Sequence, residues 1–218
     1  MPLDKTLKEN AAKLRGFFAA EFSNFILLHQ HNGNRLIYRY PLIQYKILNG
    51  IPLILSIEKG VDVLKSIYDK YHSIRLGGHT YEIREKEIKL KEEEIGIQNG
   101  KLLYRFITPW LALNKKNYEK YQELKNWGKR KEFLVKILIG NIISMSKSLG
   151  YTVCDPLNAM IIHLKEVKIY LKHTPMLGFI GTFSINFTLP DYIGLGKSVS
   201  RGFGTIRRIS KHDVANNR

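Results

Sequence analysis

Two histidines that stand two positions apart, His29 and His31, are the residues of this sequence best suited to acid–base chemistry. An imidazole has a reference pKa of about 6.5, so it can take up or release a proton near neutral pH. In an extended segment, residues two apart share one face, so both rings could reach one reacting bond, whereas in a helix they would point apart. The Asn32-Gly33 turn that follows favours the extended state.

The same pair of histidines has two other interpretations. A His-X-His pair can hold a metal ion, but no third ligand stands at a fitting spacing, so we predict no metal site and no cofactor. The pair could also be two ordinary exposed loop histidines that take part in no reaction.

A glycine-rich segment, residues 194–204, carries the second chemical signal. Glycine lets the backbone approach a ligand closely, and exposed N–H groups beside lysine and arginine suit phosphates. The segment is not a nucleotide-binding P-loop, because that motif requires glycine where Asp191 stands. The alternative is a loop that only turns the chain. The predicted RNA-binding residues are Gly194, Gly196, Lys197, Ser198, Ser200, Arg201, Gly202 and Gly204.

Three further side chains, Tyr38, Tyr40 and Lys46, are candidates for stabilising a phosphate beside the histidines. Residues 36–48 are rich in Ile and Tyr and predict a long strand, in which Pro41 indicates an edge position or a bulge. Strand alternation then places the three candidates on one face, provided that Pro41 causes no slip. A packed aromatic face with an exposed lysine is the alternative interpretation.

The composition is that of a folded, strongly basic protein. Of the 218 residues, 44% are hydrophobic and 25% charged, which excludes wholesale disorder. The formal net charge of +16 indicates a polyanionic partner, either nucleic acid or an anionic membrane surface. The single cysteine, Cys154, allows no intramolecular disulfide. Neither a signal peptide nor a membrane span is expected, and we predict a cytoplasmic protein.

The N-terminal part predicts a mixture of helices and hairpins. Apolar residues at spacings of three and four predict a helix over residues 6–22. The Asn49-Gly50 pair predicts a hairpin turn before a second strand at 51–57. Residues 80–95 alternate apolar and charged side chains and predict a half-exposed strand.

The C-terminal part repeats this organisation. The Asn99-Gly100 pair predicts a second hairpin turn. The expected strands are 102–108, 160–171, 176–189 and 205–209, and the expected helices are 118–127 and 129–149. We therefore predict an α+β protein of two tandem ferredoxin-like (RRM-like) domains, residues 1–98 and 99–218, the first lacking its opening strand and the second carrying the glycine-rich loop.

Several segments together resemble one protein family. They are KLRG at 13–16, YRYPLIQYK at 38–46, TPWLALN at 108–114 and PDYIGLGKS at 190–198, followed by Gly202-Phe203-Gly204. The chain resembles the CRISPR-associated endoribonucleases that process precursor CRISPR RNA, in particular their b-type subgroup, within the superfamily of repeat-associated RNA-binding proteins. The match runs from about residue 11 to residue 209.

The resemblance implies two ferredoxin-like domains in tandem and metal-independent cleavage of RNA. A base removes the proton of a ribose 2′-hydroxyl, that oxygen attacks the adjacent phosphorus, and an acid protonates the leaving 5′-oxygen. The family places its catalytic histidine in the region that here holds His29 and His31, and it uses a further cation or tyrosine, for which Tyr38, Tyr40 and Lys46 are the candidates. Sequence does not assign base and acid.

The implied partner is CRISPR repeat RNA within precursor CRISPR RNA. Other CRISPR effector proteins and a second copy of the chain are further partners that the resemblance leaves open. One rival is a non-catalytic protein that binds the repeat and retains the guide RNA. A general RNA-recognition module is a second rival, but Tyr104-Arg-Phe106 is not the aromatic signature of such modules. A membrane-surface protein is the third.

Overall fold

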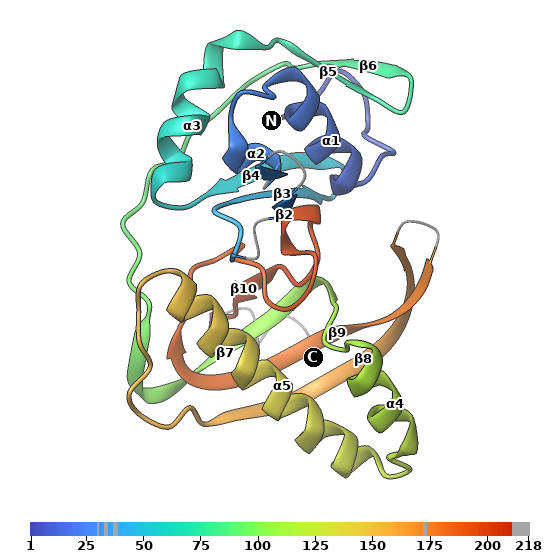
Figure 1. Ribbon diagram of the computed structural model, residues 1–218, viewed down its shortest axis with the longest axis vertical. Helices are drawn as coiled ribbons and strands as arrows, with labels where there is room; N and C mark the ends of the chain where they lie inside the picture. The colour runs from blue at the N-terminus through green and yellow to red at the C-terminus, as the bar shows by residue number, and fades with distance from the viewer. Residues whose placement is uncertain (30, 33–34, 37–38, 172–173, 211–218) are drawn as a thin grey trace. The chain divides into compact units, whose positions relative to one another are not determined.

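The chain folds into two units, which the computed structural model describes over residues 1–29, 31–32, 35–36, 39–171 and 174–210 (Figure 1). Unit 1 consists of Met1–Glu92 and Val199–Gly202, and unit 2 of Glu93–Ser198 and Phe203–Arg218. A short segment from near the C-terminus therefore belongs with the N-terminal unit.

Unit 1 combines helices with three short hairpins. Its elements are α1 (Ala11–Glu21), α2 (Ile26–His29), β1 (His31–Asn32), β2 (Arg35–Leu36), β3 (Ile43–Leu48), β4 (Ile51–Ser56), α3 (Lys59–Ile67), η1 (Tyr68–Lys70), β5 (Ser73–Leu76), β6 (His79–Glu82) and η2 (Val199–Arg201). Strands β1 and β2, β3 and β4, and β5 and β6 pair antiparallel as separate two-stranded sheets. No strand among the described residues joins β4 to β5.

Helix α1 supplies the centre of the unit 1 core. Asn10 caps the helix, because its side chain accepts a hydrogen bond from the Lys13 backbone N–H at 3.1 Å. Phe18 is fully buried, and its ring lies 5.6 Å from that of Tyr45 on β3 and 5.0 Å from that of Tyr71. The predicted helix over 6–22 exists, but it begins only after its cap at Asn10.

The N-terminal residues contact two of the hairpins of unit 1. The Met1 amino group donates to the Pro52 carbonyl of β4 at 3.0 Å. Leu3 forms an antiparallel bridge with Ile83, directly after β6. Residues 1–4 therefore run between β4 and the end of β6.

Two sequence predictions for unit 1 were wrong in detail. The predicted long strand over 36–48 is divided into β2 and β3, and Pro41, which has no N–H to donate, lies between them. The predicted strand over 80–95 ends with β6 at Glu82. Beyond it, Ile88 and Leu90 are exposed, so the alternating pattern there has no core to face. The hairpin at Asn49-Gly50 is confirmed, since Leu48 pairs with Ile51.

Unit 2 is built on a four-stranded antiparallel sheet. Its elements are β7 (Gly96–Trp110), α4 (Lys115–Glu123), α5 (Trp127–Ser148), β8 (Ala159–Leu171), β9 (Thr174–Thr188) and β10 (Ile206–Arg208). The strand order is β10-β7-β9-β8, which is the order of a ferredoxin-like sheet. Between β9 and β10, where that fold has its second helix, the described residues form the glycine-rich loop and the short η2.

One face of this sheet carries the core and is covered by α5 (Figure 1). Tyr104 and Phe106 of β7 and Phe183 of β9 are buried with ring centroids 5.1–5.6 Å apart. Leu134 and Leu138 are among the α5 residues that are fully buried. The opposite face of the sheet carries Arg105, which alternation places away from its buried neighbours.

The predicted hairpin at Asn99-Gly100 does not form. Strand β7 runs through it, and the register with β9 shifts between Ile97 and Leu102. Strand β9 pairs with β7 both before and after Asn99-Gly100, so the polar pair forms a bulge within one strand. Among the described residues, no separate strand directly before residue 99 is available to make a hairpin with the residues that follow.

A hydrogen bond to Tyr104 holds the residue after β9 against the core. The Tyr104 hydroxyl accepts a hydrogen bond from the Leu189 N–H at 2.9 Å, and burial raises the pKa of this hydroxyl. Tyr104→Phe leaves that buried N–H without its partner, so we expect a loss of about 1–3 kcal/mol in the free energy of unfolding of unit 2. Denaturation followed by tryptophan fluorescence measures this, since both tryptophans, Trp110 and Trp127, lie in unit 2.

Tyr118→Phe on α4 is the matched control, because Tyr118 is 45% exposed. It should leave the denaturation curve unchanged. Equal curves for the two variants would contradict the assigned role of the Tyr104 hydroxyl.

Candidate functional site

The two candidate histidines lie at a change of backbone conformation in unit 1. His29 is the last residue of α2, and His31 is the first residue of β1, which pairs with Leu36. The expectation of one extended segment through both residues was therefore wrong for His29, which is helical. Tyr45 holds the backbone at the end of α2 in place, because its hydroxyl donates to the Leu28 carbonyl at 3.3 Å.

The Tyr45 hydroxyl is suited to this anchoring role. Its residue is fully buried, and burial raises the pKa of Tyr45 above its ordinary value. The hydroxyl therefore keeps its proton and remains a donor to the backbone that leads into His29.

On the other face of β3, Lys46, Gln44 and Tyr40 form a chain of hydrogen bonds. The Lys46 ammonium nitrogen donates to the Gln44 amide oxygen at 3.0 Å. The Gln44 amide nitrogen donates to the Tyr40 hydroxyl at 2.9 Å and to the Pro41 carbonyl at 3.2 Å. Lys46 and Gln44 are both 0% exposed, whereas Tyr40 is half-buried. The chain thus leads from a buried amine to a tyrosine nearer the surface.

Burial changes the acid–base character of Lys46. Desolvation lowers the pKa of Lys46 from 10.5 to about 7, because the charged form loses its water. A group whose pKa lies near neutral pH is often part of a functional site. With its side chain enclosed, Lys46 acts on its surroundings through Gln44.

The glycine-rich loop is held against β7 and the segment that follows it by backbone hydrogen bonds in unit 2. The Lys197 N–H donates to Leu111 at 3.1 Å, and the Gly204 N–H donates to Pro109 at 2.8 Å. Gly194 is buried and bridges Thr205. Lys197 is exposed, and Ser198 is half-buried. These bonds fix the two ends of the loop and leave the Lys197 side chain accessible.

The middle of the loop, η2 with Gly202, packs in unit 1. Val199 is buried, and η2 contacts both α1 and β3. Gly202 has φ +88°, and a Cβ there would lie 2.8 Å from Ala11 Cβ and 3.1 Å from the Tyr45 carbonyl oxygen. Only glycine meets both requirements, a left-handed backbone and close approach to α1 and β3.

This packing brings two arginines together. The pKa of the Arg15 guanidinium on α1 is lowered, first by burial and then by the charge of Arg201 on η2. Two guanidinium groups that repel each other create a positive potential suited to an anion. Ser200, also on η2, is half-buried next to Arg201.

The predicted site residues are divided between the two units. Lys46, Tyr40, Ser200, Arg201, Gly202 and the backbones of His29 and His31 belong to unit 1. Gly194, Gly196, Lys197, Ser198 and Gly204 belong to unit 2. Tyr38 lies outside the described residues.

Arg15 and Gln44 are further candidates that the structure adds and that the sequence analysis did not name. Both stand inside the segments that carry the family resemblance, at 13–16 and 38–46, and Gln44 alternates with Lys46 on one face of β3. That alternation was the available signal for Gln44. No local pattern indicates that Arg15 meets Arg201, because the two are far apart in the sequence.

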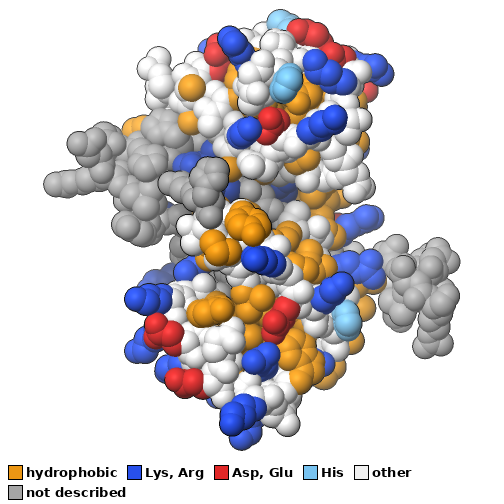
Figure 2. Space-filling model, turned by 90° about the vertical axis from the view of Figure 1, so that its right-hand side faces the viewer, with side chains coloured by type: hydrophobic (Ala, Val, Ile, Leu, Met, Phe, Trp, Pro, Cys, Tyr) orange, Lys and Arg blue, Asp and Glu red, His pale blue; other side chains and the backbone are white. Residues whose placement is uncertain are grey.

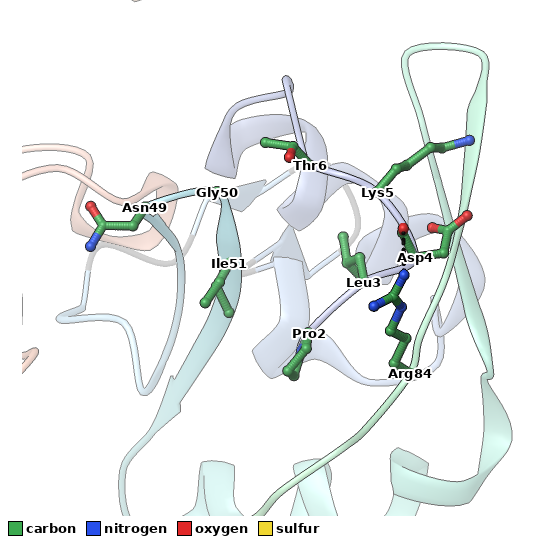
Figure 3. A pocket seen from close by; sticks show the side chains of 9 residues that line it. All are labelled: Pro2, Leu3, Asp4, Lys5, Thr6, Asn49, Gly50, Ile51 and Arg84. Carbon is green, nitrogen blue, oxygen red and sulfur yellow. Dashed lines mark hydrogen bonds between the residues drawn. The ribbon is translucent and has the colours of Figure 1, made fainter.

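An open pocket of about 320 Å³ lies elsewhere in unit 1 (Figure 3). Its lining residues are Pro2, Leu3, Asp4, Lys5, Thr6, Asn49, Gly50, Ile51 and Arg84. Arg84 donates to the Asp4 carbonyl at 3.0 Å across its mouth. None of the predicted site residues lines it, so we assign it no role in the site.

The wider surface is basic and mixed in character. Figure 2 shows Lys and Arg side chains over much of the face that it presents, with hydrophobic side chains among them. Among the described residues, no three His, Cys, Asp or Glu side chains gather as metal ligands. No helix in the described ranges combines the length and apolar character that crossing a membrane requires.

Comparisons with known proteins agree with a fold of two ferredoxin-like domains. Residues 1–94 match the family profile of the Cas6b N-terminal domain, and residues 96–209 match that of the Cas6b C-terminal domain. An uncharacterized protein of Methanocaldococcus jannaschii is 44% identical over 138 residues, which is 63% of this chain and 93% of that protein.

Solved structures are similar over nearly the whole chain. A crystal structure of Cas6b is 42% identical, with a TM-score of 0.87 and 91% of each chain covered. A CRISPR RNA processing endoribonuclease Cas6b is 39% identical, with a TM-score of 0.70, covering 91% of this chain and 90% of that one. A Cas6-related protein from Pyrococcus furiosus, 14% identical with a TM-score of 0.52, shares the fold.

The fold and the profile matches define a CRISPR-associated protein of the repeat-associated class, with two ferredoxin-like domains. Within that class, the chain belongs to the Cas6b family.

Gly202→Ala tests the packing of η2. The added methyl strains a backbone at φ +88° and collides with Ala11, so we expect Gly202→Ala to cost about 1–3 kcal/mol more unfolding free energy than Gly78→Ala. Gly78 is the matched control, since it has φ +84° with nothing within 4 Å of an added Cβ. Denaturation followed by far-UV circular dichroism measures both, and equal losses would show that η2 does not depend on this contact.

The variant Lys46→Met tests whether the buried amine of Lys46 makes the stability of the protein depend on pH. Between the folded pKa of about 7 and the ordinary value of 10.5, the unfolded chain binds a proton that the folded chain does not. This group therefore makes stability rise with pH across that window, by up to about 1.4 kcal/mol per pH unit. Lys46→Met should therefore raise the free energy of unfolding most below pH 7. The difference in unfolding free energy between this variant and the parent should shrink as the pH rises toward 10.

Denaturation at pH 6, 8 and 9.5 measures this difference. Lys65→Met is the control, because Lys65 is exposed on α3 and should give a pH-independent difference. A constant difference for Lys46→Met would mean that its amine is solvated.

Proposed function

We propose that this protein is an endoribonuclease that binds CRISPR repeat RNA and cleaves precursor CRISPR RNA. The observation that carries the proposal is the match of both domains to Cas6b, including a 39% identical relative named as a CRISPR RNA processing endoribonuclease. The net charge of +16 supports an RNA partner.

In the proposed reaction, His29 and His31 carry the proton transfers. One imidazole removes the proton of a ribose 2′-hydroxyl, whose oxygen attacks the adjacent phosphorus. The bond from phosphorus to the 5′-oxygen breaks, and the other imidazole donates a proton to that oxygen. The products are a 2′,3′-cyclic phosphate and a 5′-hydroxyl. Every step is a proton transfer or an attack by RNA itself, so the reaction calls for no metal ion.

Side chains around the histidines would stabilise the charge on phosphorus. Tyr38 and Tyr40 are proposed to donate hydrogen bonds to the phosphate oxygens. Because Lys46 is enclosed, we give it a positioning role: it holds Gln44, and Gln44 holds the Tyr40 hydroxyl. Donors held in place before the reaction stabilise a transition state better than donors that must reorient.

The glycine-rich loop is proposed to hold the RNA backbone. Lys197, Ser198, Ser200 and Arg201 offer side-chain donors, and Arg15 reinforces Arg201. The glycines of the loop, Gly194, Gly196, Gly202 and Gly204, are proposed to shape the backbone that presents these donors, since an added Cβ at Gly196, Gly202 or Gly204 would collide with other protein groups. Contacts of this kind fix position and contribute affinity that falls with salt.

The test is cleavage of a single repeat RNA from the neighbouring array in EDTA, comparing the parent with His29→Ala/His31→Ala. We expect one cut in the parent and a rate at least about a hundredfold lower in the double variant, because each proton transfer contributes about 10²–10⁴-fold. A 2′-deoxy nucleotide at the cut should abolish cleavage in both.

His72→Ala/His79→Ala is the matched control, since both side chains are exposed in unit 1. It should cleave at the parental rate. Tight binding of the repeat without any cut by the parent would favour a non-catalytic protein that retains the guide RNA. Cleavage that survives in His29→Ala/His31→Ala would move the catalytic assignment to other residues.

A further inference from the structure

A row of polar residues crosses the open face of the unit 2 sheet, opposite the face that α5 covers. Strand pairing aligns Arg207 of β10 with Arg105 of β7, Arg105 with Thr182 of β9, and Thr182 with His163 of β8. Residues directly opposite in an antiparallel sheet point to the same face. Arg105, Arg207 and His163 are exposed, and Thr182 is half-buried.

A bulge in β8 brings His163 into this row. The register shifts between Ile161 and His163, so that Ile162 is the extra residue and His163 faces Thr182. The strands approach so closely there that a Cβ on Gly181 would lie 2.1 Å from the His163 carbonyl oxygen. Bulges often redirect side chains beside functional sites, and this one continues the row with an imidazole in place of an aliphatic side chain.

Within the part of the chain that the structure describes, no acidic side chain pairs with either of the two arginines. Cross-strand partners have Cβ atoms about 4.5–5.5 Å apart, and like charges directly opposite each other destabilise a sheet. Within the described ranges, neither guanidinium makes an ion pair or a hydrogen bond to a protein group. The neighbours two residues away on β7, Leu103 and Ile107, are half-buried and apolar, so they offer no acceptor.

We propose that Arg105 and Arg207 form a phosphate-binding pair that holds single-stranded RNA across the open face of the unit 2 sheet. A phosphodiester between the two guanidinium groups offsets their repulsion and offers each the paired oxygens that arginine prefers. The flat aliphatic surface around them accepts ribose and base, and the Thr182 hydroxyl and His163 imidazole extend the row of donors. This inference rests on the proposed function for the identity of the RNA.

The position of Arg105 makes this face different from an aromatic RNA-recognition sheet. Its neighbours Tyr104 and Phe106 are 0% and 1% exposed and face the core. The residue between them is therefore the one presented to a ligand, and it is an arginine, which both binds phosphate and stacks on bases. Arg105 and Arg207 belong to unit 2, whereas η2 and Arg201 belong to unit 1.

The test is the salt dependence of RNA binding by Arg105→Ala/Arg207→Ala, made in the His29→Ala/His31→Ala background so that the RNA stays intact on a gel. The probe is fluorescently labelled repeat RNA, titrated between 50 and 300 mM salt. We expect Kd to rise by about tenfold or more and the slope of log Kd against log salt to fall by about 1.4, because each single-strand phosphate contact contributes about 0.7. A scrambled RNA of equal length should lose affinity equally, because phosphate contacts carry no sequence information.

Two control variants keep the result interpretable. Lys59→Ala/Lys65→Ala removes the same charge from exposed positions on α3 and should change Kd by no more than about twofold. Arg105→Lys/Arg207→Lys should retain most of the salt slope, since it keeps both charges. A Kd and slope for Arg105→Ala/Arg207→Ala equal to those of the α3 control would overturn the proposal.

The outcome also separates this inference from the proposed function. Single-turnover cleavage by the parent at saturating protein reports on the nuclease, and Lys59→Ala/Lys65→Ala should cleave at the parental rate, since these exposed lysines of α3 belong to neither site. A parent that fails to cut, combined with weaker binding by the arginine variant, supports the RNA site and refutes the nuclease. A parent that cuts, combined with unchanged binding, refutes the RNA site alone.

Discussion

The proposed active site depends on the mutual packing of α1, β3 and η2. Gly202 lets η2 approach within van der Waals contact of Ala11 and the Tyr45 backbone, and this approach places Arg201 where its charge acts on Arg15. The same strand anchors the end of α2, because the Tyr45 hydroxyl binds the Leu28 carbonyl directly before His29. One packing contact thus connects the loop near the C-terminus, the first helix and the segment of the candidate histidines. A change in that contact would move the charge of Arg201 and the backbone of the candidate histidines together.

The alternating side chains of β3 face two different environments, an apolar core on one side and a polar hydrogen-bonded chain on the other. Tyr45 points to the core beside Phe18, whereas Gln44 and Lys46 point the other way and form a polar chain with Tyr40. Enclosing an amine costs free energy, and this cost appears as the lowered pKa of Lys46. The amine donates to the Gln44 amide oxygen and, among the described residues, makes no ion pair with a carboxylate. A satisfied polar network of this kind holds its members in one arrangement, which is what a preorganised hydroxyl at Tyr40 requires.

Positive charge gathers in two ways in this protein. Arg15 and Arg201 come from distant parts of the sequence and meet through helix and turn packing, whereas Arg105 and Arg207 meet through strand register. In both cases the fold holds like charges close together, an arrangement that costs stability in the free protein. An anionic partner offsets that cost, which links the basic composition to particular residues. The two pairs belong to different units.

The sequence by itself determined the class of fold, the basic character, the family and most elements of unit 2, because apolar periodicity and turn residues act locally. It also indicated the glycine-rich loop and the histidine region through short motifs. It did not determine the end of β6, which depends on whether a core is present to bury the alternating pattern. Nor did it determine the division of the strand at Pro41 or the helical state of His29. Only the tertiary structure decided that Lys46 is enclosed, that Arg15 meets Arg201 and that Arg105 faces Arg207. These contacts join residues far apart in the chain, and their existence depends on packing and strand register, which no local pattern of residues specifies.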